Sequence, residues 1–142
     1  MSFVDFVTKA SPKIIAVGLN YLKHVKEVGE SNIPKTPLLF LKPWSSLTYM
    51  PKTVSLPKAK IHRVDHEIEL GVFISKRGVN LKKEDVNSHI GGYFIGVDIS
   101  DRVLQGMGNG VGFPSLIAKG QDNFCPISSM FSKDIDPYKV EL

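Results

Sequence analysis

Residues 65–74 read DHEIELGVFI, and the interpretation of the whole chain starts from this stretch. Successive side chains of a β-strand point to opposite faces, so the alternating pattern predicts a strand. Glu67 and Glu69 then share one face. The aliphatic residues share the other, which we expect to be the core face, and they are Ile68, Leu70, Val72 and Ile74.

Two carboxylates at neighbouring positions on one face repel each other, and the repulsion grows as water is removed. Either the strand has an acidic surface face, or a cation binds there. Asp98, near the end of the apolar segment YFIGVDI, could be a third ligand or only a strand-end residue. Three carboxylates with no nearby Cys or His pair suit Mg²⁺, Mn²⁺ or Ca²⁺ better than zinc.

The composition predicts a single domain covering residues 1–142, with 42% hydrophobic and 23% charged residues to form a packed core. The net charge of +4 comes from scattered lysines, which favours a solvated exterior over a nucleic-acid surface. The single cysteine, Cys125, rules out a disulfide framework and a cysteine-based zinc site. We find no apolar stretch that approaches the roughly 20 residues needed to cross a bilayer.

The remaining sequence predicts short elements. Buried strands are expected at residues 13–18 and 37–41, with further strands at residues 93–99 and 116–119. Helical segments are expected at residues 20–28, 82–89 and 101–105, the last one capped by Ser100. The glycines between residues 106 and 112 indicate a flexible loop and lack the context of a phosphate-binding loop. Poor βαβ alternation favours a β-rich mixed α+β fold over a doubly wound sheet.

Other polar residues could take part in chemistry or could be ordinary surface residues. His24 and Glu27 lie three apart on the predicted helix, where a carboxylate would make the imidazole a better general base. Lys119 follows an apolar run and could stabilise developing negative charge. Arg102 and Gln105 could face the same cavity, and the arginine would suit a substrate carboxylate. Each has a plain alternative, an exposed side chain in water.

Several stretches, taken in order, resemble the fumarylacetoacetate hydrolase family, and most closely its small acylpyruvase-like branch. They are IIAVGLNYLKHVKEV, PLLFLKP, HEIELGVFI, IGGYFIGVDIS and IAKGQDNFCPISS. The ordered set is specific: HxxE after a GxNY turn, then ExE, then an aspartate about thirty residues later.

The resemblance implies a mixed β-roll with short helices, usually in a homodimer, located in mitochondria or cytoplasm. It implies that Glu67, Glu69 and Asp98 hold Mg²⁺ or Mn²⁺. By the same resemblance, His24 with Glu27 activates water, Lys119 is the matching catalytic lysine, and Arg102 with Gln105 contacts substrate. The implied reaction is C–C bond hydrolysis of 1,3-diketo acids such as acylpyruvates. Decarboxylation or keto–enol tautomerisation of oxaloacetate is the alternative.

The sequence also departs from the family pattern. Leu19 stands where the family usually has arginine, and Ser115 where an aromatic residue is common. Family chains continue beyond a segment like DPYKVEL, so we expect a chain that lacks C-terminal strands. A shortened, inactive form is therefore a further hypothesis.

Overall fold

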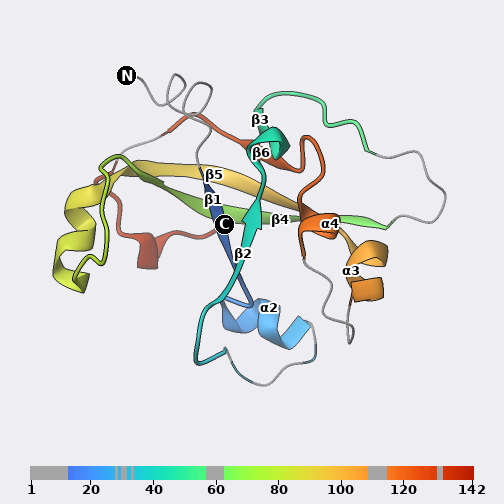
Figure 1. The fold of residues 1–142 in the computed structure, drawn as a ribbon, viewed down its shortest axis with the longest axis horizontal. Helices are drawn as coiled ribbons and strands as arrows, with labels where there is room; N and C mark the ends of the chain where they lie inside the picture. Colours follow the sequence, from blue (N-terminus) through green and yellow to red (C-terminus); the bar gives the residue numbers. More distant parts are fainter. Residues whose placement is uncertain are drawn as a thin grey trace.

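The structure, a computed structural model, describes residues 13–27, 29, 32, 34–56, 63–108, 115–130 and 133–142 (Figure 1). Its strands are β1 (Ile14–Gly18), β2 (Leu38–Lys42), β3 (Leu47–Tyr49), β4 (Val64–Ile74), β5 (Ile90–Asp101) and β6 (Cys125–Ile127). Its helices are α2 (Leu22–Glu27), α3 (Arg102–Gly108) and α4 (Leu116–Lys119), with 3₁₀ turns η1 (Trp44–Ser46), η2 (Lys83–His89) and η3 (Pro137–Lys139). The predicted β-rich mixed α+β class is confirmed.

The described strands form two sheets. A four-stranded sheet has the order β3-β6-β5-β4, and the antiparallel pair β4–β5 contributes its two longest strands. The two-stranded antiparallel sheet β1–β2 crosses this pair in Figure 1. Its inner face meets the larger sheet, because Ile14 packs with Phe94 against the buried side chains of Cys125 and Ile127. The described helices are too short and polar to span a membrane.

The register of the β4–β5 pair decides which side chains meet. Glu67 lies directly opposite Asp98, and Gly71 lies opposite Phe94. A Cβ atom on Gly71 would come within 2.2 Å of the Phe94 ring, so only glycine leaves room for the ring on this face. The face that carries the carboxylates is therefore also the face that packs.

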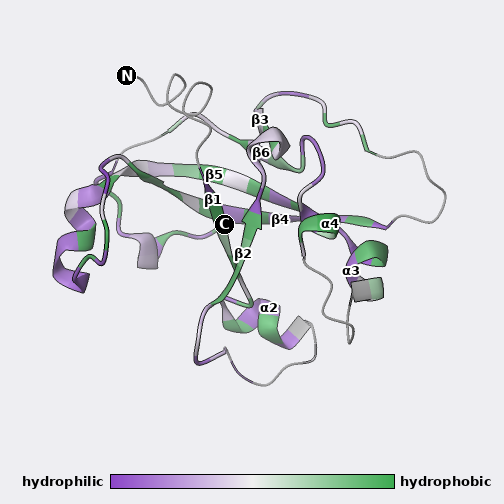
Figure 2. Cartoon of the chain, in the orientation of Figure 1, coloured by the Kyte–Doolittle hydropathy of each residue, from purple (hydrophilic) through white to green (hydrophobic). Residues whose placement is uncertain are grey.

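The prediction that the aliphatic face of β4 is the core face is wrong for the described residues. Ile68, Val72 and Ile74 are 42%, 45% and 50% exposed, whereas the Glu67 side chain is only 14% exposed. The reason is tertiary, because Lys119 of α4 and Lys42 of β2 reach the carboxylates of this face. Figure 2 shows the hydropathy of each position along these elements. The strands β1 and β2, predicted as buried, likewise alternate, and Ile15 and Leu41 are exposed.

Three local predictions are also corrected. Residues 116–119 form helix α4 and not a strand, because backbone bonds from Lys119 to Ser115 and from Gly120 to Leu116 close a helical turn. Asp101, and not Ser100, caps helix α3, since its carboxylate accepts from two backbone amides at 3.1 Å. That helix also includes part of the expected glycine loop. The rest of that loop, residues 109–114, lies outside the described residues.

Candidate functional site

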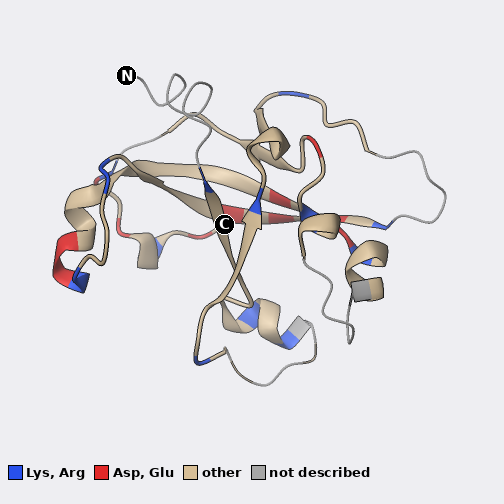
Figure 3. Cartoon of the chain, viewed as in Figure 1, with Lys and Arg blue, Asp and Glu red and all other residues tan. Residues whose placement is uncertain are grey.

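The carboxylates of β4 and β5 meet an ammonium group from helix α4. The Lys119 Nζ lies 3.0 Å from Glu67 Oε2 and 2.6 Å from Asp98 Oδ2. It also lies 2.5 Å from the hydroxyl of Ser100, which belongs to β5. Figure 3 shows the acidic positions of the two strands beside each other, with basic positions of β2 and α4 next to them. The structure therefore brings together Glu67, Asp98 and Lys119, three of the residues that the sequence singled out.

Glu69 completes the acidic face but has a different electrostatic environment. Burial, and then the negative charges of Asp98 and Glu67, raise the pKa of Glu69 to about 7. Burial also opposes ionisation of Glu67, but the hydrogen bond from Arg102 and the Lys119 ammonium hold its pKa below the usual range. The site thus has one carboxylate more than its cations neutralise.

Among the described residues, no three His, Cys, Asp or Glu side chains are arranged as a finished metal centre. Lys119 instead bridges two of the three predicted ligands. The residues nevertheless fit a hard divalent cation in charge and donor type, because burial and two neighbouring carboxylates raise the pKa of Glu69, and a cation beside it would favour the ionised form. Asp98 Oδ1 is also buried without a hydrogen bond, although the Lys42 ammonium is 2.8 Å away.

The predicted water-activating pair lies on helix α2. Val25, which is fully buried, anchors this helix, while Leu22 is exposed. The His24 Nε2 is directed toward the site and lies 3.9 Å from Glu67 Oε1. The side chain of Glu27 lies outside the described residues, so its pairing with His24 stays a prediction.

The predicted substrate-binding pair is assembled beside Glu67, at the same carboxylate oxygen that His24 approaches. The Arg102 guanidinium donates to Gln105 Oε1 at 2.8 Å and to Asp65 Oδ2 at 3.0 Å, and it also donates to Glu67 Oε1. Asp65 was not singled out from the sequence, although it opens the quoted segment DHEIELGVFI. In this arrangement the guanidinium already has three acceptors.

Lys42 is the second residue that the sequence interpretation missed. Its side chain is 2% exposed, and its ammonium lies 2.8 Å from Asp98 Oδ1. It donates to the carbonyl of Phe124 at 2.9 Å and also to the carbonyl of Lys119. Burial lowers the pKa of Lys42, while the Asp98 charge opposes this shift. A lysine at the end of the apolar run PLLFLK was the available signal.

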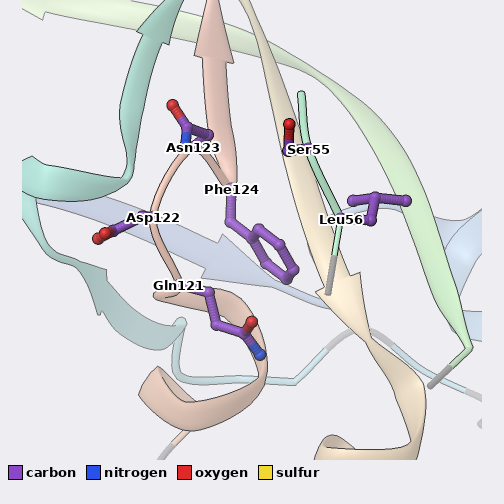
Figure 4. A pocket seen from close by; sticks show the side chains of 6 residues that line it. All are labelled: Ser55, Leu56, Gln121, Asp122, Asn123 and Phe124. Carbon is purple, nitrogen blue, oxygen red and sulfur yellow. The ribbon is translucent and has the colours of Figure 1, made fainter. Parts of the chain in front are cut away.

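A shallow hollow of about 380 Å³ lies elsewhere, beside the turn that precedes β6 (Figure 4). Its lining residues are Ser55, Leu56, Gln121, Asp122, Asn123 and Phe124. None of them belongs to the predicted site. We therefore assign the functional site to the carboxylate face and not to this hollow.

Comparison with known sequences supports the same family. Residues 13–140 match the model of the fumarylacetoacetate (FAA) hydrolase C-terminal domain. The mitochondrial oxaloacetate tautomerase FAHD2 of Arabidopsis thaliana is 38% identical over 99% of this chain and 63% of its own length. The mitochondrial oxaloacetate decarboxylase of Dictyostelium discoideum is 38% identical over 86% of this chain and 56% of its own length. The chain thus spans less than two thirds of these relatives.

Solved structures give the same result. A fumarylacetoacetate hydrolase family protein from Yersinia pestis matches with a TM-score of 0.78 and 37% identity, over 84% of this chain and 54% of its own. A fumarylpyruvate hydrolase from Pseudomonas aeruginosa, solved with Mn²⁺ and pyruvate, matches with a TM-score of 0.75 and 30% identity, over 84% and 52%. Together with the matched family model, these similarities establish that the chain belongs to the fumarylacetoacetate hydrolase family.

Proposed function

We propose that this chain carries the catalytic face of an enzyme that cleaves acylpyruvate-type 1,3-diketo acids by hydrolysis of a C–C bond. The observation that carries the proposal is the convergence of Glu67, Asp98 and Lys119, with Glu69 beside them as an excess carboxylate. Such a face can hold a divalent cation and an anionic substrate at the same place. The pyruvate and Mn²⁺ of the Pseudomonas aeruginosa relative are consistent with this chemistry.

Glu67, Glu69 and Asp98 would hold the cation, for which we propose Mg²⁺, with Mn²⁺ or Ca²⁺ as alternatives. A divalent cation there would supply Lewis-acid polarisation of the 2-oxo acid. The buried ammonium of Lys119 would stabilise the negative charge of the leaving pyruvate enolate. Arg102, oriented by Asp65 and Gln105, would bind the substrate carboxylate.

His24 would act as the general base. Its Nε2 borders the acidic face, near Glu67, where an attacking water could lie between the imidazole and the distal carbonyl of the substrate. The water oxygen would form the new C–O bond, the C–C bond would break, and the departing enolate would take up a proton to give pyruvate. Glu27 would fix the orientation of His24 from the last position of α2.

The second candidate function is tautomerisation or decarboxylation of oxaloacetate. It is favoured by the names of the two mitochondrial relatives in Arabidopsis thaliana and Dictyostelium discoideum. It would use the same carboxylates and Lys119 but would not need an activated water. These relatives also support a mitochondrial location, with the cytoplasm as the alternative. We further propose that the active form is a homodimer.

Turnover assays with His24→Ala separate the two functions. Hydrolysis predicts that acetylpyruvate turnover with Mg²⁺ stops both with EDTA and in the variant. Oxaloacetate chemistry predicts enol–keto conversion or decarboxylation that survives the loss of His24. A folded protein that shows neither turnover, and no thermal stabilisation by metal plus oxalate, would contradict both and favour an inactive form.

A further inference from the structure

We propose that Lys42 is a positioning residue. It holds the Asp98 carboxylate and the backbone carbonyl of Lys119 in fixed positions relative to each other. This inference builds on the proposed function, because it concerns the same carboxylate face. Lys42 lies at the end of β2, far in sequence from the residues it contacts. It has been assigned no role by the sequence motifs described above.

The contacts of Lys42 connect three segments of the chain. Its ammonium pairs with Asp98 of β5 at 2.8 Å. It donates to the carbonyl of Lys119, the last residue of α4, and to the carbonyl of Phe124, just before β6. It also donates to the carbonyl of Ile99 at 3.4 Å. A side chain that is 2% exposed and bound to three backbone carbonyls has no room for substrate on its ammonium. Lys42 therefore acts through other residues and does not touch the substrate.

The two lysines lie at different oxygens of the Asp98 carboxylate. Lys42 faces Oδ1, whereas Lys119 faces Oδ2 and also reaches Glu67. The two ammonium groups thus contact different oxygens of one carboxylate. Holding Oδ1 in place fixes the direction in which Oδ2 is presented.

An independent packing feature supports the same connection. A Cβ atom on Gly120 would lie 2.9 Å from Cδ of Pro43 and 2.6 Å from the carbonyl oxygen of Leu116. The end of α4 therefore approaches the Lys42–Pro43 segment so closely that only glycine fits. Side-chain bonds and backbone packing together join β2 to the turn that carries Lys119.

Hydrogen–deuterium exchange of the whole chain tests this role without any assay of turnover. In Lys42→Met, we expect amides of residues 119–125 to exchange about tenfold faster or more, because the anchored carbonyls lose their donor. Amides at the centre of the β4–β5 pair should stay within about twofold of the unmodified protein. Lys82→Met, at an exposed lysine, is the matched control and should change neither region.

A double-mutant cycle then tests whether Lys42 acts through the site. Lys42→Met alone should lower kcat at least about tenfold with little change in KM, since Lys42 does not contact the substrate. In a Lys119→Met background the same substitution should lower kcat much less, because the residue that it positions is already gone. Equal effects in both backgrounds would overturn the proposal.

Lys42→Gln, which keeps an amide donor for the carbonyls but no charge for Asp98, is the second variant if Lys42→Met does not fold. It should accelerate exchange in the same residues, but less than Lys42→Met does, because the amide still donates to a carbonyl. Uniform acceleration across the chain, or unfolding of both variants, would make Lys42 a general stability residue and would overturn its positioning role. If the unmodified protein shows no turnover but Lys42→Met still accelerates exchange locally, the proposed function is refuted and the positioning role stands.

Discussion

The two faces of strand β4 lie in environments opposite to those that their hydropathy predicts, because the acidic face is covered and the aliphatic face is exposed. The face with Glu67 and Glu69 is covered by Lys119, Arg102 and His24. The face with Ile68 and Val72 is exposed among the described residues. Alternation correctly predicts which side chains share a face, but the elements that pack on the strand decide which face is covered.

The comparison shows that the acidic face is buried at an electrostatic cost. Lysines at two positions and one arginine offset part of this cost, and Glu69 bears the remainder as a raised pKa. Perturbed carboxylates of this kind concentrate at functional sites. Burial of carboxylates on one face of β4 destabilises the fold, so their presence there is more readily explained by function than by folding alone.

Among the substitutions that test this comparison, Asp98→Asn should have the largest effect on stability. The substitution leaves the buried ammonium groups of Lys42 and Lys119 without their shared counter-ion, so the free energy of unfolding should fall by about 3–5 kcal/mol. Urea denaturation measures this change. Asp122→Asn, at an exposed carboxylate, is the control and should change stability by less than about 0.5 kcal/mol. Similar effects of both substitutions would contradict the buried ion-pair network.

A smaller effect is expected from Glu69→Gln, and it should depend on pH. The pKa of Glu69 is about 7 in the folded protein and 4.5 in the reference state. Between these values the folded state keeps a proton that the unfolded state has released, so stability should fall as pH rises through this window. Over the same pH range, the free energy of unfolding of Glu69→Gln should fall by about 2 kcal/mol less than that of the unmodified protein. Urea unfolding in EDTA measures this difference.

The same experiment has an internal control at lower pH. Hydrogen bonds from Arg102 keep the pKa of Asp65 low, and Glu67 also has a lowered pKa. Their contributions are present above their unfolded-state pKa values and are lost as pH falls further, in both proteins alike. A variant whose pH profile matches that of the unmodified protein at every pH would show that Glu69 is not in a low-dielectric, acidic environment.

The smallest effect is expected on the other face of the strand. Val72→Thr removes apolar surface where the side chain is 45% exposed, so the free energy of unfolding should change by less than about 0.5 kcal/mol. Ile127→Val, at a side chain only 1% exposed, is the contrasting substitution and should cost about 0.5–1.5 kcal/mol. A larger loss from Val72→Thr would show that another chain or segment covers this face.

Part of the site was predictable from local spacing and part from the family resemblance. The alternation around Glu67 and Glu69 predicts their shared face, whereas the resemblance relates them to Asp98, His24 and Lys119. The structure then places Asp98 opposite Glu67. The strand β4, the helix α2 and the turn η2 also lie where their patterns predict them.

The remaining features depend on contacts between distant segments. Lys42 and Asp98 are 56 positions apart in sequence (98 minus 42), and no spacing rule connects them. The segment LIAK is too short for its periodicity to distinguish a helix from a strand, so α4 was misassigned. Ser100 and Asp101 are both good capping residues, but helix α3 begins at Arg102, so Asp101 holds the capping position and the Ser100 hydroxyl contacts Lys119.

Calorimetric titration with Mn²⁺ tests the central claim, that the acidic face of β4 and β5 binds a divalent cation. The folded chain should bind about one Mn²⁺, Glu69→Gln should bind it at least about tenfold more weakly, and Lys119→Met should bind it more tightly because Glu67 and Asp98 are released. Absence of binding by well-folded protein, or equal affinity in the unmodified chain and Glu69→Gln, would contradict the claim.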